Sequence, residues 1–185
     1  MPFGTLWLPV VVSTVGVFLA SFLVHMVLKY HKADVKQLPN EEGVRDALGK
    51  GTLPPGQYMT PYCVDHKQMK EPAMQEKFKK GPVAIVTVFP SGSDMGKHMA
   101  LWVGYCLLAS FTAAYIARHT LSAASPPMQI MQITGAVAFV AYGYGNFVDS
   151  IWKGQPWSNT VRALIDSLIY AILTSIIFCW LWPKG

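Results

Sequence analysis

The chain has 185 residues, of which 52% are hydrophobic and only 14% are charged, and its formal net charge is +5. An average soluble domain has roughly 25% charged residues, so this composition excludes an ordinary soluble domain. Acidic and basic residues are mixed along the chain, which favours a surface facing water or lipid headgroups and argues against a nucleic-acid-binding protein.

Four apolar segments predict transmembrane helices, at residues 6–28, 99–117, 128–148 and 163–182. A helix rises about 1.5 Å per residue, so about 20 mostly apolar residues cross the roughly 30 Å hydrocarbon core. The first segment lacks the basic start and the cleavage site of a signal peptide, so we expect it to be retained. The sequence therefore predicts an all-α membrane protein: a single membrane domain over residues 1–185, built as a four-transmembrane-helix bundle.

The positions of lysine and arginine predict how these helices are oriented. Most of the 15 basic residues lie at 29–97 or in the connection between the third and fourth segments, whereas Arg118 and Lys184 lie on the opposite side. Basic residues are enriched in cytoplasmic loops. We therefore expect residues 29–97 in the cytoplasm and both termini outside.

The cytoplasmic segment carries signals for short secondary-structure elements. Asn40 is suited to cap a helix at 41–48, and residues 72–80 form a second candidate helix. Prolines and glycines exclude a helix over 51–62, which we expect to be an ordered loop or an extended strand. Residues 83–89 predict a strand that packs on the helix ends or on the Tyr58 segment, so a small β-hairpin is one outcome.

Polar residues inside or beside the apolar segments are the first place to look for function, because polar groups are expensive in hydrocarbon. Arg162, Asp166 and Tyr170 are spaced four residues apart, so they share one helical face, where the first two can pair. The full candidate cluster, expected on the cytoplasmic side, is His25, His98, Asn146, Asp149, Arg162, Asp166 and Tyr170. It is either an ion path or polar ligand site in which Asp166 titrates, or a structural network near the headgroups.

Histidine and cysteine side chains suggest two weaker metal-site hypotheses. His25 and His98 lie on helices that we expect to be antiparallel, so they are candidates for two axial haem ligands or part of a metal site. Cys63 and His66 have a C-x-x-H spacing, although a tetrahedral zinc site needs four ligands. Neither pattern is complete, so we expect no cofactor.

Motifs typical of hydrolases, nucleotide-binding proteins and zinc proteases do not occur in the sequence, and we do not expect an enzyme. Small residues at helical spacing, Thr134, Ala138, Ala141 and Gly145, predict a helix face buried against another helix. Our leading hypothesis is an accessory or scaffold subunit that forms a homo-oligomer or joins a larger membrane complex. The alternatives are a small channel or transporter that uses the polar cluster, and a haem- or metal-binding redox protein.

Four stretches, MPFGTLWLPV, PPGQYMTPYC, GPVAIVTVFP and SIWKGQPWSNTVRALIDSLIYA, resemble bacterial multi-pass membrane proteins of unassigned function. The resemblance covers most of the chain and implies the bacterial cytoplasmic (inner) membrane. It implies no activity, so no site residue is assigned from it.

Overall fold

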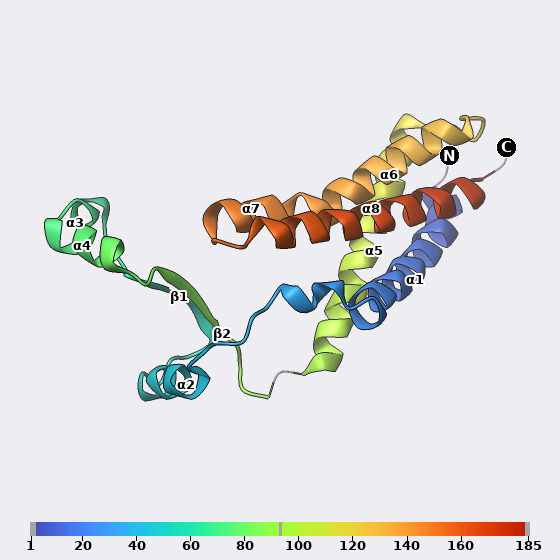
Figure 1. The fold of residues 1–185 in the computed structure, drawn as a ribbon. Helices are drawn as coiled ribbons and strands as arrows, with labels where there is room; N and C mark the ends of the chain where they lie inside the picture. Colours follow the sequence, from blue (N-terminus) through green and yellow to red (C-terminus); the bar gives the residue numbers. More distant parts are fainter. Residues whose placement is uncertain (1–2, 93, 184–185) are drawn as a thin grey trace. The chain divides into compact units, whose positions relative to one another are not determined.

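A computed structural model describes residues 3–92 and 94–183, and the chain divides into two compact units. The first unit combines residues 1–36 with 95–185, and the second comprises residues 37–94. Long helices make the first unit, whereas short helices and a two-stranded sheet make the second (Figure 1). The mostly helical character expected from the sequence is confirmed.

Four long helices form the framework of the first unit. Its elements are η1 (Phe3–Leu6), α1 (Trp7–Phe22), the π-helical turn η2 (Leu23–Val27), the 3-10 turn η3 (Tyr30–Ala33), α5 (Met95–Thr120), α6 (Pro127–Gly143), α7 (Gly145–Trp152) and α8 (Trp157–Trp180). Helices α1 and α6 each pack against both α5 and α8. Each of the four long helices therefore has two neighbours.

Three helices in the described chain are long and apolar enough to cross a membrane: Gly4–Val27, Met95–Thr120 and Trp157–Trp180. They correspond to the first, second and fourth predicted segments. A fourth span is not supported, because the third segment is broken where α6 ends at Gly143 after 17 residues. A helix of that length extends about 25 Å, which is less than the roughly 30 Å hydrocarbon core.

Glycines allow α8 to lie close to its neighbours. A Cβ added to Gly135 of α6 would lie 3.2 Å from the Ser175 Cβ, and one added to Gly16 of α1 would lie 3.0 Å from Ile177. The predicted small-residue face of α6 is buried in part, since Thr134 and Ala138 are inaccessible. Within this chain, the small residues thus serve contacts between its own helices.

One apolar cluster joins four helix ends. It contains Leu6, Val10, Ala113, Ala114, Ala117, Ile130, Phe178 and Trp182. These residues come from the beginnings of α1 and α6 and the ends of α5 and α8, so successive long helices of the first unit are antiparallel. The polar residues described below lie toward the opposite end of these helices.

The second unit contains α2 (Glu41–Lys50), β1 (Gly56–Thr60), α3 (His66–Met69), α4 (Pro72–Lys80) and β2 (Ala84–Val88). Asn40 caps α2 by accepting a hydrogen bond from the backbone N–H of Gly43. Strands β1 and β2 are antiparallel, with Tyr58 opposite Val86. The predicted short helices and the packing of the second strand on the Tyr58 segment are confirmed.

Candidate metal centre

The site begins with a sharp change of chain direction after α1. Lys29 adopts a left-handed backbone conformation with φ of 57°, which is uncommon for a residue with a Cβ. The chain then forms η3, which brings His31 to Asp166 of α8. Residues 135 positions apart in the sequence thus meet within the first unit.

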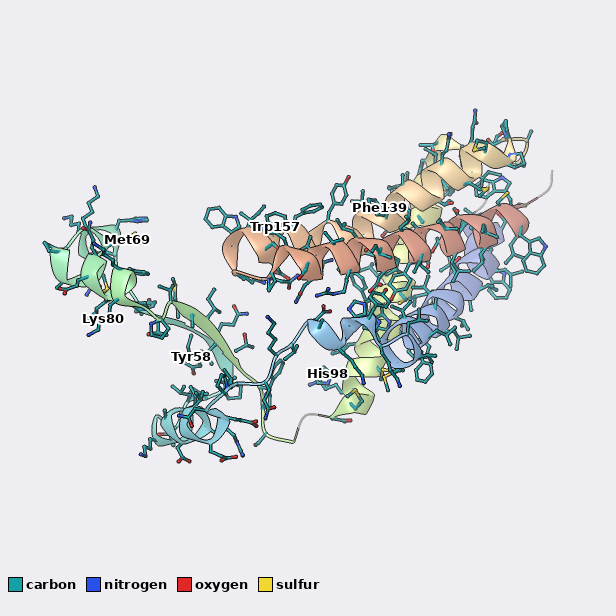
Figure 2. All side chains as sticks on the ribbon, viewed as in Figure 1. Tyr58, Met69, Lys80, His98, Phe139 and Trp157 are labelled. Carbon is teal, nitrogen blue, oxygen red and sulfur yellow. The ribbon has the colours of Figure 1, made fainter. Side chains whose placement is uncertain are left out.

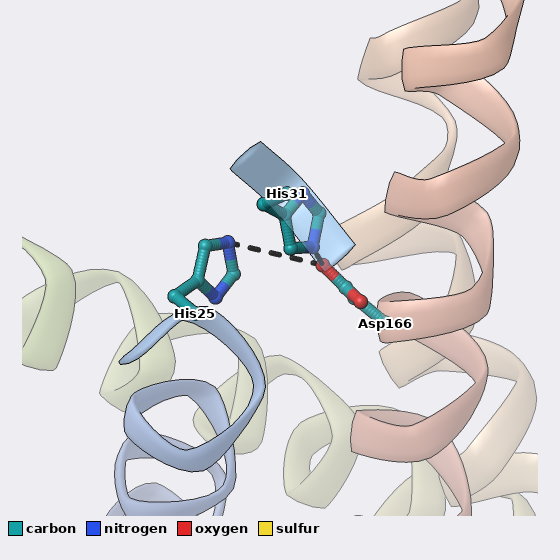
Figure 3. A group of neighbouring side chains, drawn as sticks. All are labelled: His25, His31 and Asp166. Atoms are coloured by element: carbon teal, nitrogen blue, oxygen red, sulfur yellow. Dashed lines mark ion pairs between the residues drawn. The ribbon is translucent and has the colours of Figure 1, made fainter. Parts of the chain in front are cut away.

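Three potential metal donors converge here from three different elements, as Figure 3 shows for His25, His31 and Asp166. The Nε2 atoms of His31 and His25 lie 2.8 Å and 3.9 Å from Oδ2 of Asp166. All three donor atoms lie within 4.8 Å of one another. The side chains of Asp166 and His31 are 7% and 15% exposed, whereas that of His25 is 50% exposed, so one side of the group is open.

Both histidine rings are held through their other nitrogen. His31 Nδ1 lies 2.6 Å from Oδ2 of Asp34, and His25 Nδ1 lies 3.0 Å from the backbone oxygen of Ser21. Carboxylate and carbonyl oxygens only accept hydrogen bonds, so each Nδ1 carries the proton. The Nε2 atoms are left facing Asp166, which is how proteins orient histidines that bind metals.

The acceptor for His31 is itself fixed in place. Arg162 Nε donates to Oδ1 of Asp34 at 2.5 Å, and the Asn159 amide donates to the Asp34 backbone oxygen at 3.0 Å. Burial alone would raise the pKa of Asp34, but hydrogen bonds from His31 and Arg162 outweigh it and hold the pKa below its ordinary value. Asp34 is therefore ionised at neutral pH, and its carboxylate orients His31.

The second oxygen of Asp166 is occupied by a different partner. The Tyr30 hydroxyl donates a hydrogen bond to Oδ1 of Asp166. This contact fixes the carboxylate plane and leaves Oδ2 facing the two histidines. In the described chain, His31 Nε2 is buried without a hydrogen-bond partner. With the proton on Nδ1, this nitrogen is an acceptor that faces a carboxylate oxygen of Asp166, which is also an acceptor.

The donor separations are close to those around one transition-metal ion, but the rings of His25 and His31 are stacked with centroids 4.3 Å apart and must turn to share that ion. Zinc binds imidazole nitrogen and carboxylate oxygen at about 2.0–2.2 Å, so two such ligands on one ion lie roughly 3–3.5 Å apart. The observed separations of 2.8 and 3.9 Å fall on either side of that range. Two imidazoles and one carboxylate are ligands for zinc, iron or copper, and they leave coordination positions for water or a small molecule.

The structure brings together some of the predicted site residues and separates others. His25 and Asp166 meet, whereas Arg162 bonds Asp34 rather than Asp166. Tyr170 lies one turn along α8 from Asp166, and its ring packs edge-on against Tyr142, with centroids 5.3 Å apart. It is therefore part of an aromatic contact between helices.

The remaining predicted residues have other surroundings. His98 lies near the beginning of α5 (Figure 2) and is not in the three-donor group found among the described residues. Cys63 and His66 belong to the second unit and are likewise outside that group. Asn146 donates to the backbone oxygen of Gly143 across the break before α7, and Asp149 pairs with Lys153 at 2.7 Å.

Sequence reasoning did not place Tyr30, His31 and Asp34 in the site. These residues follow the first apolar segment. The turn that brings them to α8 depends on the left-handed backbone of Lys29, and a lysine does not predict that conformation. The one local signal is the spacing of His31 and Asp34, which can pair within a helical turn.

Comparison with known proteins returned no matching family model, no matching curated protein and no matching solved structure. The site is therefore interpreted from its own geometry.

Proposed function

We propose that the protein is a membrane protein that binds a divalent transition-metal ion through His25, His31 and Asp166. The observation that carries this proposal is the environment of His31. Its Nδ1 proton is committed to Asp34, so its buried Nε2 has only a lone pair to turn toward the carboxylate of Asp166, 2.8 Å away, and forms no hydrogen bond. A cation between the nitrogen and the oxygen satisfies both atoms.

The position of Asp166 gives a second reason to expect a cation. This carboxylate is 5% exposed and lies in a helix that is apolar enough to cross a membrane. A buried carboxylate is stable when a cation or a set of donors compensates its charge. Three protein ligands resemble a metal site with an open position, so we favour a redox or ligand-binding role over a purely structural one.

For the location, we propose the bacterial inner membrane with the second unit in the cytoplasm. The support is the concentration of lysine and arginine at residues 29–97. The accessory-subunit, homo-oligomer and channel hypotheses stay predictions. Purification in mild detergent with identification of co-purifying proteins addresses the first two, and flux into proteoliposomes addresses the third.

Cobalt is a suitable probe for the metal site, because its visible absorption reports ligand number and geometry. The chelator-treated protein in detergent is titrated with Co²⁺ and then competed with Zn²⁺. We expect one ion per chain, and Asp166→Asn should weaken binding on the order of a hundredfold or more, since loss of even an outer-shell partner costs about 10–100-fold.

Two variants serve as matched controls. Asp149→Asn removes a carboxylate that is paired with Lys153, and His119→Gln removes a histidine that packs on Tyr115. Both should bind Co²⁺ like the unmodified protein. Absence of stoichiometric binding, or equal affinity in Asp166→Asn and Asp149→Asn, would show that the three residues are a structural network.

A further inference from the structure

Thioether side chains line a pocket beside the candidate metal centre. Met26 of η2 and Met95 and Met99 of α5 contribute to a pocket of about 390 Å³. Its other lining residues are Ser21, Phe22, His25 and Trp102. Met95 and Met99 are four residues apart on one helix, so they share a face, and Met26 meets them from the other wall.

The lining is uncharged and rich in sulfur. Among the described residues that line the pocket there is no carboxylate, lysine or arginine. A divalent ion would therefore bring two uncompensated positive charges into the pocket, whereas a monovalent ion brings only one. Thioether sulfur is a preferred ligand of Cu(I), and the unbranched methionine side chain adjusts readily to a ligand.

We propose that this pocket binds Cu(I) through the sulfur atoms of Met26, Met95 and Met99. The ring of His25 forms the wall between the pocket and the candidate metal centre, because it lines the first and its Nε2 faces Asp166. The two neighbouring ligand sets suit the two oxidation states of copper: thioethers for Cu(I), and imidazole with carboxylate for Cu(II). The Cu(I) site goes beyond the proposed function and does not depend on it.

A lipid acyl chain is the alternative occupant of such a groove. Met26 and Met95 are 65% and 72% exposed, so an acyl chain has access to them. A Met→Leu substitution distinguishes the two occupants, because it keeps the apolar volume of the side chain and removes the sulfur. An acyl chain packs against methionine or leucine alike, whereas Cu(I) requires the thioether sulfur of methionine.

The test is a titration with Cu(I) under reducing conditions, in competition with a coloured Cu(I) chelator, on the full-length protein in detergent. Copper X-ray absorption then identifies the coordinating atoms. We expect one Cu(I) with sulfur neighbours. Each single Met→Leu variant removes a proposed ligand and should weaken binding at least about tenfold, since loss of even an outer-shell partner costs about 10–100-fold, and the triple variant should abolish binding.

Two controls distinguish this site from the candidate metal centre. Met128→Leu replaces a 64% exposed methionine in α6, away from the pocket lining, and should leave Cu(I) binding unchanged. Asp166→Asn should bind Co²⁺ much more weakly and bind Cu(I) like the unmodified protein, so the two proposals fail separately. Undiminished Cu(I) binding by the triple variant, or coordination by nitrogen and oxygen alone, would overturn the proposal.

Discussion

Buried and partly buried polar side chains in the first unit fall into two groups that differ in their hydrogen bonding. Around Asp166, the side chains of Tyr30, Asp34 and Arg162 are all engaged with partners. Deeper among the helices, hydroxyl groups have no partner within the described chain; these belong to Ser13, Ser110, Tyr142, Tyr170 and Thr174. The first group is organised around one place, whereas the second is distributed over four helices.

The difference separates a candidate site from a packing compromise. Leaving a buried hydroxyl unpaired costs about 1–3 kcal/mol, and nothing around those five hydroxyls marks a ligand. At Asp166, the neighbouring bonds instead fix every ring and carboxylate and leave one nitrogen, His31 Nε2, facing the shared oxygen. A metal site requires ligands that are held in place by hydrogen bonds and that keep a donor atom unpaired, as His31 Nε2 is here.

The largest change in stability should follow from breaking the ion pair between Arg162 and Asp34, which supports His31 from outside the candidate metal centre. Arg162→Met leaves the Asp34 carboxylate without its guanidinium partner. Breaking a fully buried pair costs 3–5 kcal/mol. Because these two side chains are 20% and 23% exposed, we expect roughly 1–3 kcal/mol here. The melting temperature in detergent should fall by about 2–4 °C per kcal/mol for a chain of this size.

The pair between Lys153 and Asp149 provides the control. Its side chains are 50% and 36% exposed, so Lys153→Met should change stability by no more than about 1 kcal/mol. Equal melting temperatures for the two variants would mean that the Arg162 pair contributes no more than an ordinary surface contact.

Acidification should weaken the same network, by less than removal of Arg162 does, because a protonated Asp34 keeps its side chain in place. The pKa of Asp34 is lower in the folded protein than its ordinary value, which is about 3.9. Its contribution is therefore complete above that ordinary value and is lost as the pH falls through the lowered one. Melting temperatures of the unmodified protein and of Asp34→Asn should differ at pH 7 and converge only as the pH falls below the lowered pKa of Asp34. If the difference in melting temperature between the two proteins stays constant with pH, ionisation of Asp34 does not contribute to stability.

Local sequence signals predicted the helices well, because each carries its own evidence. The cap at Asn40 and three of the four apolar segments appear where the composition placed them. The third segment was taken as continuous because apolar composition does not reveal the break between Gly143 and Gly145. Segment length and hydropathy therefore predicted where the long helices lie, but not the break that ends α6.

The site was predicted only in part, for a different reason. Intramembrane polarity singled out Asp166 and His25, since such residues are expensive wherever they occur. Their partners depend on the backbone at Lys29, which returns His31 and Asp34 to α8. Helical spacing suggested that Arg162 would pair with Asp166. Asp34 bonds Arg162 instead, and no pattern confined to one helix contains that contact.

The smallest expected change in stability concerns the buried hydroxyl groups without a hydrogen-bond partner. Two buried threonines allow a matched test, because only one of them has such a partner. Thr174 and Thr134 are 1% and 0% exposed, but only Thr134 has a partner: its hydroxyl donates to the backbone oxygen of Ile130 at 2.7 Å. Valine has nearly the same shape as threonine without the hydroxyl. Thr174→Val should therefore stabilise the protein by about 1 kcal/mol, whereas Thr134→Val should be neutral or destabilise it by about 0.5–1.5 kcal/mol.

A higher melting temperature for Thr174→Val, with an unchanged or lower one for Thr134→Val under the same detergent condition, would establish that the buried hydroxyl of Thr174 destabilises the protein. A loss of stability in Thr174→Val comparable to that in Thr134→Val would mean that the hydroxyl of Thr174 is hydrogen-bonded in the membrane, to water or to a neighbouring protein group. The contrast between an ordered site and an interior with unpaired hydroxyl groups would then fail.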